Sequence, residues 1–145
     1  MAMGKKVLII DDDLGFTYLL QKILGECGIV ASDLTAVTSA TEATNYIVGL
    51  HPYQSRKTPD LIFLDLKMDG IDGFGFLEWA RLDPYGREIP VVVITGAQAP
   101  GDREKAMTLG AMGFYEKVAD PDKRRENVQS ALRKCFGNVL ENPHK

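Results

Sequence analysis

The sequence contains few of the residues that bind zinc or form a disulfide framework. Its two cysteines, Cys27 and Cys135, lie far apart, and no CxxC motif or Cys/His spacing indicates a zinc site. Both occur in apolar helical segments, so we predict buried free thiols, which fits a reducing cytoplasm. The two histidines, His51 and His144, are interpreted as surface residues.

Long hydrophobic runs and an excess of basic residues are also missing. The apolar run near the N-terminus, VLII, is too short for a signal peptide, and no segment approaches the roughly 20 apolar residues that span a bilayer. Lysine and arginine number 17 against 20 aspartates and glutamates. The basic cluster Lys123-Arg124-Arg125 has acidic neighbours, so we interpret it as a solvated helix face. We expect a cytoplasmic protein that contacts neither a membrane nor nucleic acid directly, although a domain cut from a larger protein would look the same.

A glycine-rich phosphate loop is missing after the first apolar run. Domains that bind nucleotides or flavins carry such a loop there, whereas this chain continues as IIDDDLG, with Asp11, Asp12 and Asp13 in succession. Like charges about 4 Å apart repel by roughly 4 kcal/mol at an effective dielectric near 20. An acidic loop repels phosphate unless a metal ion intervenes, so the sequence disfavours a nucleotide- or flavin-binding domain.

What the sequence does contain is a series of short apolar runs of the kind that form buried strands. Continuous runs occur at Val7–Ile10, Leu61–Leu64 and 90–94, and a shorter apolar run occurs at 114–115. Strands of this type are usually covered on both faces, as in parallel sheets. A weaker, alternating run at 33–37 indicates an edge strand.

Helical signals separate these runs. The first helix is expected at 14–27, with Tyr18 among its apolar positions, and a capping box beginning at Ser39 opens a second. Gly110 indicates the end of a fourth helix, and Asp120 followed by proline opens the last. The alternation predicts an α/β domain with a parallel sheet, right-handed crossovers and helices on both faces.

Polar residues with complementary chemistry stand at the ends of the predicted strands. Counting the edge strand at 33–37 as the second, Asp65 comes at the end of the third predicted strand, Thr95 after the fourth and Lys117 near the end of the fifth. We expect them to meet the acidic cluster at one edge, because α/β sheets bind ligands at the carboxyl ends of their strands. Clustered carboxylates suit Mg²⁺, and Asp65 is placed to be a nucleophile that forms an aspartyl phosphate. The set predicts metal-assisted phosphoryl transfer, with Asp13 set apart as the cap of the first helix.

Four stretches carry a resemblance to a known family: VLIIDDD, PDLIFLDLKMDGIDG, IPVVVITGA and GAMGFYEK. They resemble the receiver domain of bacterial response regulators. The resemblance implies a flavodoxin-like (βα)5 fold, a doubly wound parallel sheet of five strands in the order 2-1-3-4-5. The receiver domain would occupy residues 5–140, followed by a C-terminal tail at 141–145.

The resemblance also implies which residues carry the chemistry. Asp65 would accept a phosphoryl group from a phosphohistidine on a sensor histidine kinase or a histidine phosphotransfer protein. By position, Asp11 and Asp12 would bind Mg²⁺ together with Asp65 and the backbone carbonyl of Lys67. The protein would catalyse only its own phosphorylation and dephosphorylation and would not otherwise be an enzyme.

Three further positions correspond to the switch residues of the family. Thr95 would move its hydroxyl to the phosphoryl group, and Lys117 would pair with that group. Phe114 occupies the aromatic switch position, where the ring is expected to turn inward on phosphorylation. The face formed by the fourth helix, fifth strand and fifth helix would then change conformation and bind a downstream protein target or a second copy of the chain.

The sequence departs from the family at two positions near the site. Val118 follows the lysine where the family usually has proline, and a cis bond before a non-proline residue costs about 2.5–4 kcal/mol, so we predict a trans or rearranged loop. Asp69 replaces a proline four residues past the phosphoacceptor and adds a carboxylate. The stretch DPYGREIP and the insertion at 49–59 resemble small stand-alone regulators associated with phytochrome-type kinases. That insertion is interpreted as a tolerated surface loop or as a partner-binding segment.

Three alternatives stay open at this point. A phosphatase of the haloacid-dehalogenase type would need a second aspartate two residues after the nucleophile, where this chain has Lys67. A degenerate receiver would act as a phosphorylation-independent interaction module, although the acceptor, metal, hydroxyl and lysine residues are all present. A receiver fragment of a hybrid histidine kinase or of a longer regulator would have the same sequence features.

Overall fold

The computed structural model describes residues 4–50, 57–68, 72–96 and 98–137. Within these residues, five strands alternate with five α-helices and two short 3-10 helices. The strands are β1 (Val7–Ile10), β2 (Leu34–Val37), β3 (Leu61–Leu64), β4 (Val91–Thr95) and β5 (Gly113–Glu116). The α-helices are α1 (Leu14–Glu26), α2 (Ala40–Val48), α3 (Gly73–Leu82), α4 (Asp102–Thr108) and α5 (Pro121–Phe136). The 3-10 helices are η1 (Ala31–Asp33) and η2 (Gly86–Glu88).

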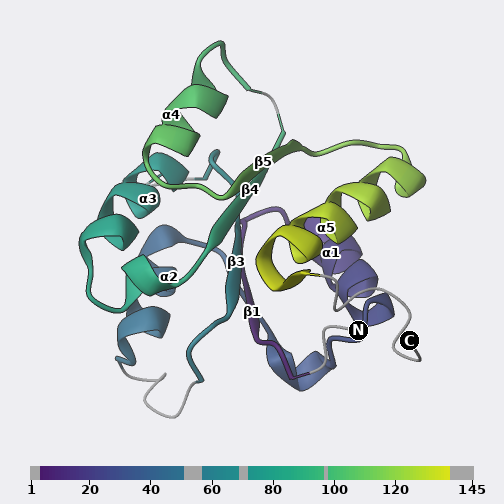
Figure 1. Cartoon of the computed structure of the whole chain (residues 1–145), viewed down its shortest axis with the longest axis horizontal. Helices are drawn as coiled ribbons and strands as arrows, with labels where there is room; N and C mark the ends of the chain where they lie inside the picture. The colour runs from purple at the N-terminus through teal and green to yellow at the C-terminus, as the bar shows by residue number, and fades with distance from the viewer. Residues whose placement is uncertain (1–3, 51–56, 69–71, 97, 138–145) are drawn as a thin grey trace.

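The strands form one parallel sheet in the order β2-β1-β3-β4-β5 (Figure 1). Every residue of β1 and β3 is buried, as continuous apolar runs predict for central strands. In the edge strand β2 only Val37 is buried, in agreement with its weaker apolar pattern. The predicted α/β, flavodoxin-like fold with strand order 2-1-3-4-5 is therefore confirmed.

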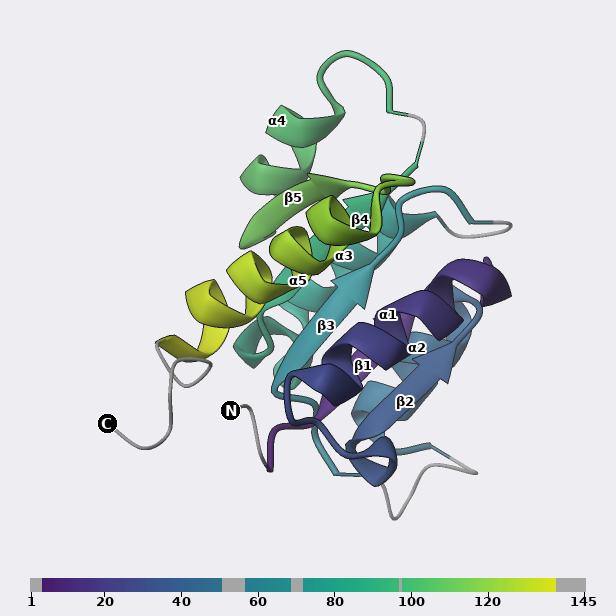
Figure 2. The same ribbon diagram turned by 90° about the vertical axis from the view of Figure 1, so that its right-hand side faces the viewer.

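Alternate residues of each strand point to opposite faces of the sheet, so the molecule has a core on each side. Leu8 and Val93 share one core with the apolar residues of α2, α3 and α4. Phe63 and Val92 share the other with those of α1 and α5, which lie side by side across the sheet (Figure 1, Figure 2). The two helical layers cover both faces and leave the strand ends as the place where polar side chains gather.

The residues that were predicted to start α2 and α5 and to end α4 are found at those places. Ser39 Oγ accepts a hydrogen bond of 3.1 Å from the Glu42 N–H and so caps α2. Asp120 caps α5 with Pro121 in the first turn. Gly110 follows α4 with a φ of 101°, a left-handed conformation that glycine adopts without strain.

Three expectations about burial are wrong. Tyr18 is 65% exposed, because it lies off the stripe of α1, including Leu20, that packs on the sheet. Cys27 and Cys135 are free, as predicted, but only partly buried, since they stand at the C-terminal ends of their helices. Arg124, assigned to a solvated face, is partly buried because its side chain turns back onto backbone carbonyls.

Several sequence predictions fall on residues outside those the structure describes. These are His51, His144, Asp69, residues 51–56 of the insertion and the tail at 141–145. Each helix in the described part of the chain is too short or too polar to span a bilayer.

Candidate functional site

The pairing of β1 with β3 brings two of the predicted site residues together. Ile10, the last residue of β1, is paired with Leu64, the last residue of β3. Asp11 and Asp65 therefore follow on adjacent strands at the same edge of the sheet. The Asp65 N–H donates a 2.9 Å hydrogen bond to the Ile10 carbonyl, which fixes the level of the two carboxylates.

The same edge continues on β4 and β5. Thr95 ends β4 and is paired with Glu116 in β5, so the next residue, Lys117, donates its N–H to the Thr95 carbonyl at 2.7 Å. The buried Thr95 hydroxyl donates a 2.8 Å hydrogen bond to Asp65 Oδ1. Lys117 Nζ lies 3.4 Å from Asp65 Oδ2. Both side chains that were expected to act at Asp65 reach its carboxylate.

Asp11, Asp12 and Asp65 form an acidic cluster in which each offers an oxygen within 4.8 Å of the others. Asp11 and Asp65 are only 3% and 4% exposed, whereas Asp12 is exposed to solvent. Lys117 brings one positive charge against three carboxylates, so the cluster keeps a net negative charge. Hard oxygen ligands with open positions suit Mg²⁺, and the residues present therefore fit a divalent cation.

Asp13 has the separate role that the sequence predicted. Its Oδ1 accepts a 3.1 Å hydrogen bond from the Phe16 N–H and caps α1. Its own N–H donates to Asp11 Oδ1 at 2.9 Å. The three aspartates of IIDDDLG thus divide into two members of the acidic cluster and one helix cap.

Burial and neighbouring charges shift the pKa of Asp11 and of Lys117. Burial raises the pKa of Asp11 from 3.8 to about 6, against the hydrogen bond from Lys117, which lowers it. Burial lowers the pKa of Lys117, but the 2.8 Å contact with Asp11 and the charge of Asp65 outweigh it, so this pKa is raised. Lys117 therefore stays charged and balances part of the acidic cluster.

The first turn of α3 packs directly on the backbone that carries Asp65. A Cβ on Gly73 would lie 2.5 Å from the Asp65 carbonyl oxygen and 2.6 Å from Leu66 Cα, so only glycine fits there. The Gly73 N–H donates to the Leu66 carbonyl at 3.1 Å, and Asp72 caps α3 through the Gly75 N–H at 2.9 Å. These contacts explain the Asp-Gly pair that ends the second matching stretch, PDLIFLDLKMDGIDG.

Comparison with known families agrees with this arrangement. The chain matches the family model of the response regulator receiver domain over residues 7–129. The chain belongs to this family. Receivers are signalling proteins of two-component systems, which agrees with the acidic cluster at the strand ends.

The relatives differ in the share of their own length that this chain covers. Response regulator Rre1 from Synechocystis is 32% identical over 132 residues, which cover 91% of this chain and 53% of Rre1. The chain thus spans about half the length of that relative. The crystal structure of the phosphorylated cyanobacterial phytochrome response regulator RcpA has a TM-score of 0.79 at 25% identity, covering 92% of this chain and 95% of RcpA. The Mn²⁺-bound form of response regulator Rcp1 has a TM-score of 0.75 at 23% identity, covering 89% and 92%.

Phe114, the residue at the predicted aromatic switch position, lies inside the molecule. Phe114 is 7% exposed and belongs to the core that contains Ala106 and Ala111. The Arg103 guanidinium lies 5.9 Å from the ring centroid and donates to the Phe114 carbonyl at 3.2 Å. The inward position of the ring thus occurs together with the hydrogen bond between Thr95 and Asp65.

Two residues near the site were missed by the reading of the sequence. Lys117 Nζ lies 4.6 Å from the centroid of the Phe16 ring, a favourable contact of a cation with an aromatic face. The buried Asp102 accepts from the Ala99 N–H at 2.8 Å and lies 3.6 Å from Lys67 Nζ. An aromatic residue in the first turn of α1 was the signal available for the first contact, but helical periodicity describes it only as part of the core.

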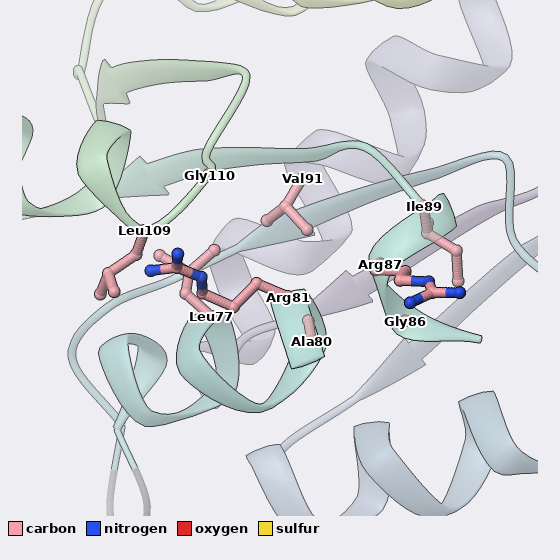
Figure 3. A pocket seen from close by; sticks show the side chains of 9 residues that line it. All are labelled: Leu77, Ala80, Arg81, Gly86, Arg87, Ile89, Val91, Leu109 and Gly110. Carbon is pink, nitrogen blue, oxygen red and sulfur yellow. The ribbon is translucent and has the colours of Figure 1, made fainter. Parts of the chain in front are cut away.

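A pocket of about 160 Å³ lies at the opposite edge of the sheet (Figure 3). It is bounded by Val91 at the start of β4, by Gly110 before β5, and by the C-terminal part of α3 and η2. Among the described residues that line it, Arg81 and Arg87 are the charged ones and none carries a carboxylate. It is therefore separate from the acidic cluster and contributes nothing to the chemistry there.

Proposed function

We propose that this receiver accepts a phosphoryl group on Asp65 from a histidine kinase or a histidine phosphotransfer protein, in a reaction that depends on Mg²⁺. The observation that carries the proposal is the convergence of complementary groups on this one carboxylate. The Thr95 hydroxyl lies 2.8 Å and Lys117 Nζ 3.4 Å from its oxygens, and Asp11 and Asp12 offer oxygens within 4.8 Å. Donors on one side and metal ligands on the other are what phosphoryl transfer requires.

Transfer of the phosphoryl group is a single displacement at phosphorus. An oxygen of Asp65 attacks the phosphorus of a phosphohistidine, an O–P bond forms and the N–P bond breaks. The released imidazole takes up a proton from solvent, and the product is an aspartyl phosphate. The Lys117 ammonium and the Thr95 hydroxyl are placed to donate to the phosphoryl oxygens, whose charge they stabilise.

The acidic cluster supports the requirement for Mg²⁺. Asp11, Asp12 and Asp65, with the backbone carbonyl of Lys67, would hold the ion. When bound, the ion neutralises the charge of the transferring phosphoryl oxygens. Without a cation these carboxylates repel an incoming phosphate. Rcp1, a neighbour in fold, has an Mn²⁺-bound form, which adds support for a divalent cation in this chain.

The phosphoryl group would act on the face formed by α4, β5 and α5 through Thr95, Lys117 and Phe114. Added negative charge at Asp65 would stabilise the arrangement seen in this structure, in which Thr95 and Lys117 contact Asp65 and Phe114 is buried. This is a two-state equilibrium biased by a local charge. The α4-β5-α5 face, to which Phe114 belongs, would then bind a downstream protein target or a second copy of the chain.

The donor we propose is a sensor kinase of the phytochrome type, on the likeness to RcpA, a phytochrome response regulator. We also propose that the protein works in the cytoplasm, where reducing conditions keep thiols such as Cys27 and Cys135 free.

The test is incubation with acetyl phosphate and Mg²⁺, followed by intact mass. We expect a gain of one phosphoryl group that is absent in Asp65→Asn and absent when the cation is chelated. Wild-type protein that gains no mass and binds no Mg²⁺ would instead be a degenerate receiver, an interaction module independent of phosphorylation.

A further inference from the structure

The loop that carries Lys117 into the site lacks the proline that usually stiffens it in the family. Residues 117–120 connect β5 to α5 at the same edge of the sheet as the site (Figure 2). On the strand side the loop is fixed by the hydrogen bond from the Lys117 N–H to the Thr95 carbonyl, at 2.7 Å. Lys117 Nζ lies 2.8 Å from Asp11. A second attachment, on the α5 side of the loop, would help to hold it there.

Arg124, in the first turn of α5, makes that second attachment. Its Nη2 donates to the carbonyl of Val118 at 3.1 Å and to the carbonyl of Ala119 at 3.2 Å. Both carbonyls lie before the cap residue Asp120, so the guanidinium binds the loop and not the helix of which it is part. Arg124 Nε is buried and has no hydrogen-bond partner among the described residues. Holding the side chain inward therefore costs free energy, because a buried donor is left unpaired.

The next residue on the helix shows that an arginine here need not bind the loop. Arg125 lies 3.2 Å from Glu26 of α1 and 3.6 Å from Asp122, both through its charged group. Arg125 and Glu26 are partly exposed and Asp122 is almost fully exposed, so these ion pairs contribute little. Arg124 is thus distinguished from its neighbour by hydrogen bonds to consecutive loop carbonyls.

We propose that Arg124 is a positioning residue for Lys117, holding the loop at Val118 and Ala119 so that the ammonium stays between Asp11 and Asp65. The proposal rests on the proposed function, because it concerns the lysine that would stabilise the phosphoryl group. A side chain from α5 does here what a rigid residue after the lysine would do. Arg124 itself does not touch Asp65 in this arrangement; it acts through the backbone that it fixes.

The first test compares Arg124→Met with Arg125→Met, which keep the length of the stem and remove the donors. We expect acetyl phosphate with Mg²⁺ to phosphorylate Arg124→Met about tenfold more slowly than wild type, because small misplacements of a catalytic group are costly. Arg125→Met should stay within about twofold of wild type. In a Lys117→Met background, Arg124→Met should have no further effect, since there is then no lysine to position.

The second test reads the placement of Lys117 without any reaction. Because Lys117 Nζ lies 4.6 Å from the Phe16 ring centroid, its ε-methylene protons should show an upfield NMR shift from that ring. We expect this shift to shrink towards the random-coil value in Arg124→Met and to persist in Arg125→Met. Arg124→Lys, which keeps charge and donors but not the planar guanidinium, should recover part of the shift and of the rate.

The outcomes separate the two proposals. An unchanged Lys117 shift in Arg124→Met, or an equal loss of rate in the Lys117→Met background, would overturn the positioning role. If the Lys117 shift shrinks in Arg124→Met as expected but the wild-type protein is never phosphorylated, the proposed function is overturned and the positioning role stands. If Arg124→Met does not fold, the comparison of Arg124→Lys with Arg125→Lys decides by the same two readouts.

Discussion

Two turns at the same edge of the sheet hold site residues by different means. After β3, the turn that carries Asp65 is fixed by neighbours in sequence: Gly73 packs on its backbone, and Asp72 caps the helix that follows. After β5, the turn that carries Lys117 is fixed from a distance, by Thr95 of another strand and by Arg124 of the next helix. A turn built from its own residues leaves a motif in the sequence, whereas a turn held by remote contacts does not.

The largest effect should come from breaking the first turn. Gly73→Ala would place a Cβ 2.5 Å from the Asp65 carbonyl oxygen, so the backbone that carries the phosphoacceptor must move. We expect the free energy of unfolding to fall by about 3 kcal/mol, at the upper end of the cost of overpacking. Denaturant unfolding measures it, and phosphorylation by acetyl phosphate should be lost with it.

Gly25→Ala is the matched control for that substitution. Apart from its chain neighbours and the backbone of its own helix, no atom of the described residues lies within 4 Å of the added Cβ. The residue is in α1, where alanine is favoured over glycine by about 0.5–1 kcal/mol. This variant should be as stable as wild type or slightly more so. If Gly73→Ala were equally harmless, the close packing of α3 on the turn would not be what fixes Asp65.

In the turn after β5, the simplest change removes the charged group of Lys117 itself. Lys117→Met removes the ammonium that lies 2.8 Å from Asp11 and 3.4 Å from Asp65. We expect the rate of phosphorylation to fall about a hundredfold, the usual cost of losing one donor to a developing charge. Lys134→Met, which also removes a lysine next to an aromatic ring, that of Tyr115, should leave the rate within about twofold of wild type. Equal rates in both variants would show that Lys117 does not act at the phosphoryl group.

This difference between the turns also explains what the sequence could predict. The order of apolar runs predicts the sheet, and residues at strand ends, such as Asp65 and Thr95, meet there because parallel strands share an edge. The inward turn of Arg124 was not predictable, because a charged residue on a helix looks the same whether it faces solvent or a loop. The exposure of Tyr18 was missed for a related reason: periodicity marks a face of a helix but not how wide a strip of it is covered.

Asp11 links the two turns, because it contacts Lys117 and belongs to the same acidic cluster as Asp65. Burial raises the pKa of Asp11 to about 6, so in the metal-free protein a proton competes with Mg²⁺ there as the pH falls below that value. We expect the affinity for Mg²⁺, measured by calorimetry, to be about tenfold lower at pH 5 than at pH 7. A carboxylate that titrates near 3.8 would give almost no change over this range, so equal affinities at the two pH values would contradict the role of Asp11.

The smallest effect is expected at the turn after β1, where neighbouring aspartates have different roles. Asp13→Ala removes the cap that accepts from the Phe16 N–H at 3.1 Å, which should lower the free energy of unfolding by about 1 kcal/mol. Its Mg²⁺ affinity should nevertheless stay close to that of wild type, because Asp13 lies outside the acidic cluster. Asp12→Ala should show the reverse, a sharp loss of Mg²⁺ affinity with little loss of stability, because this carboxylate is exposed and caps no helix. If Asp13→Ala weakened Mg²⁺ binding as much as Asp12→Ala does, the metal ligands would be displaced by one residue along IIDDDLG.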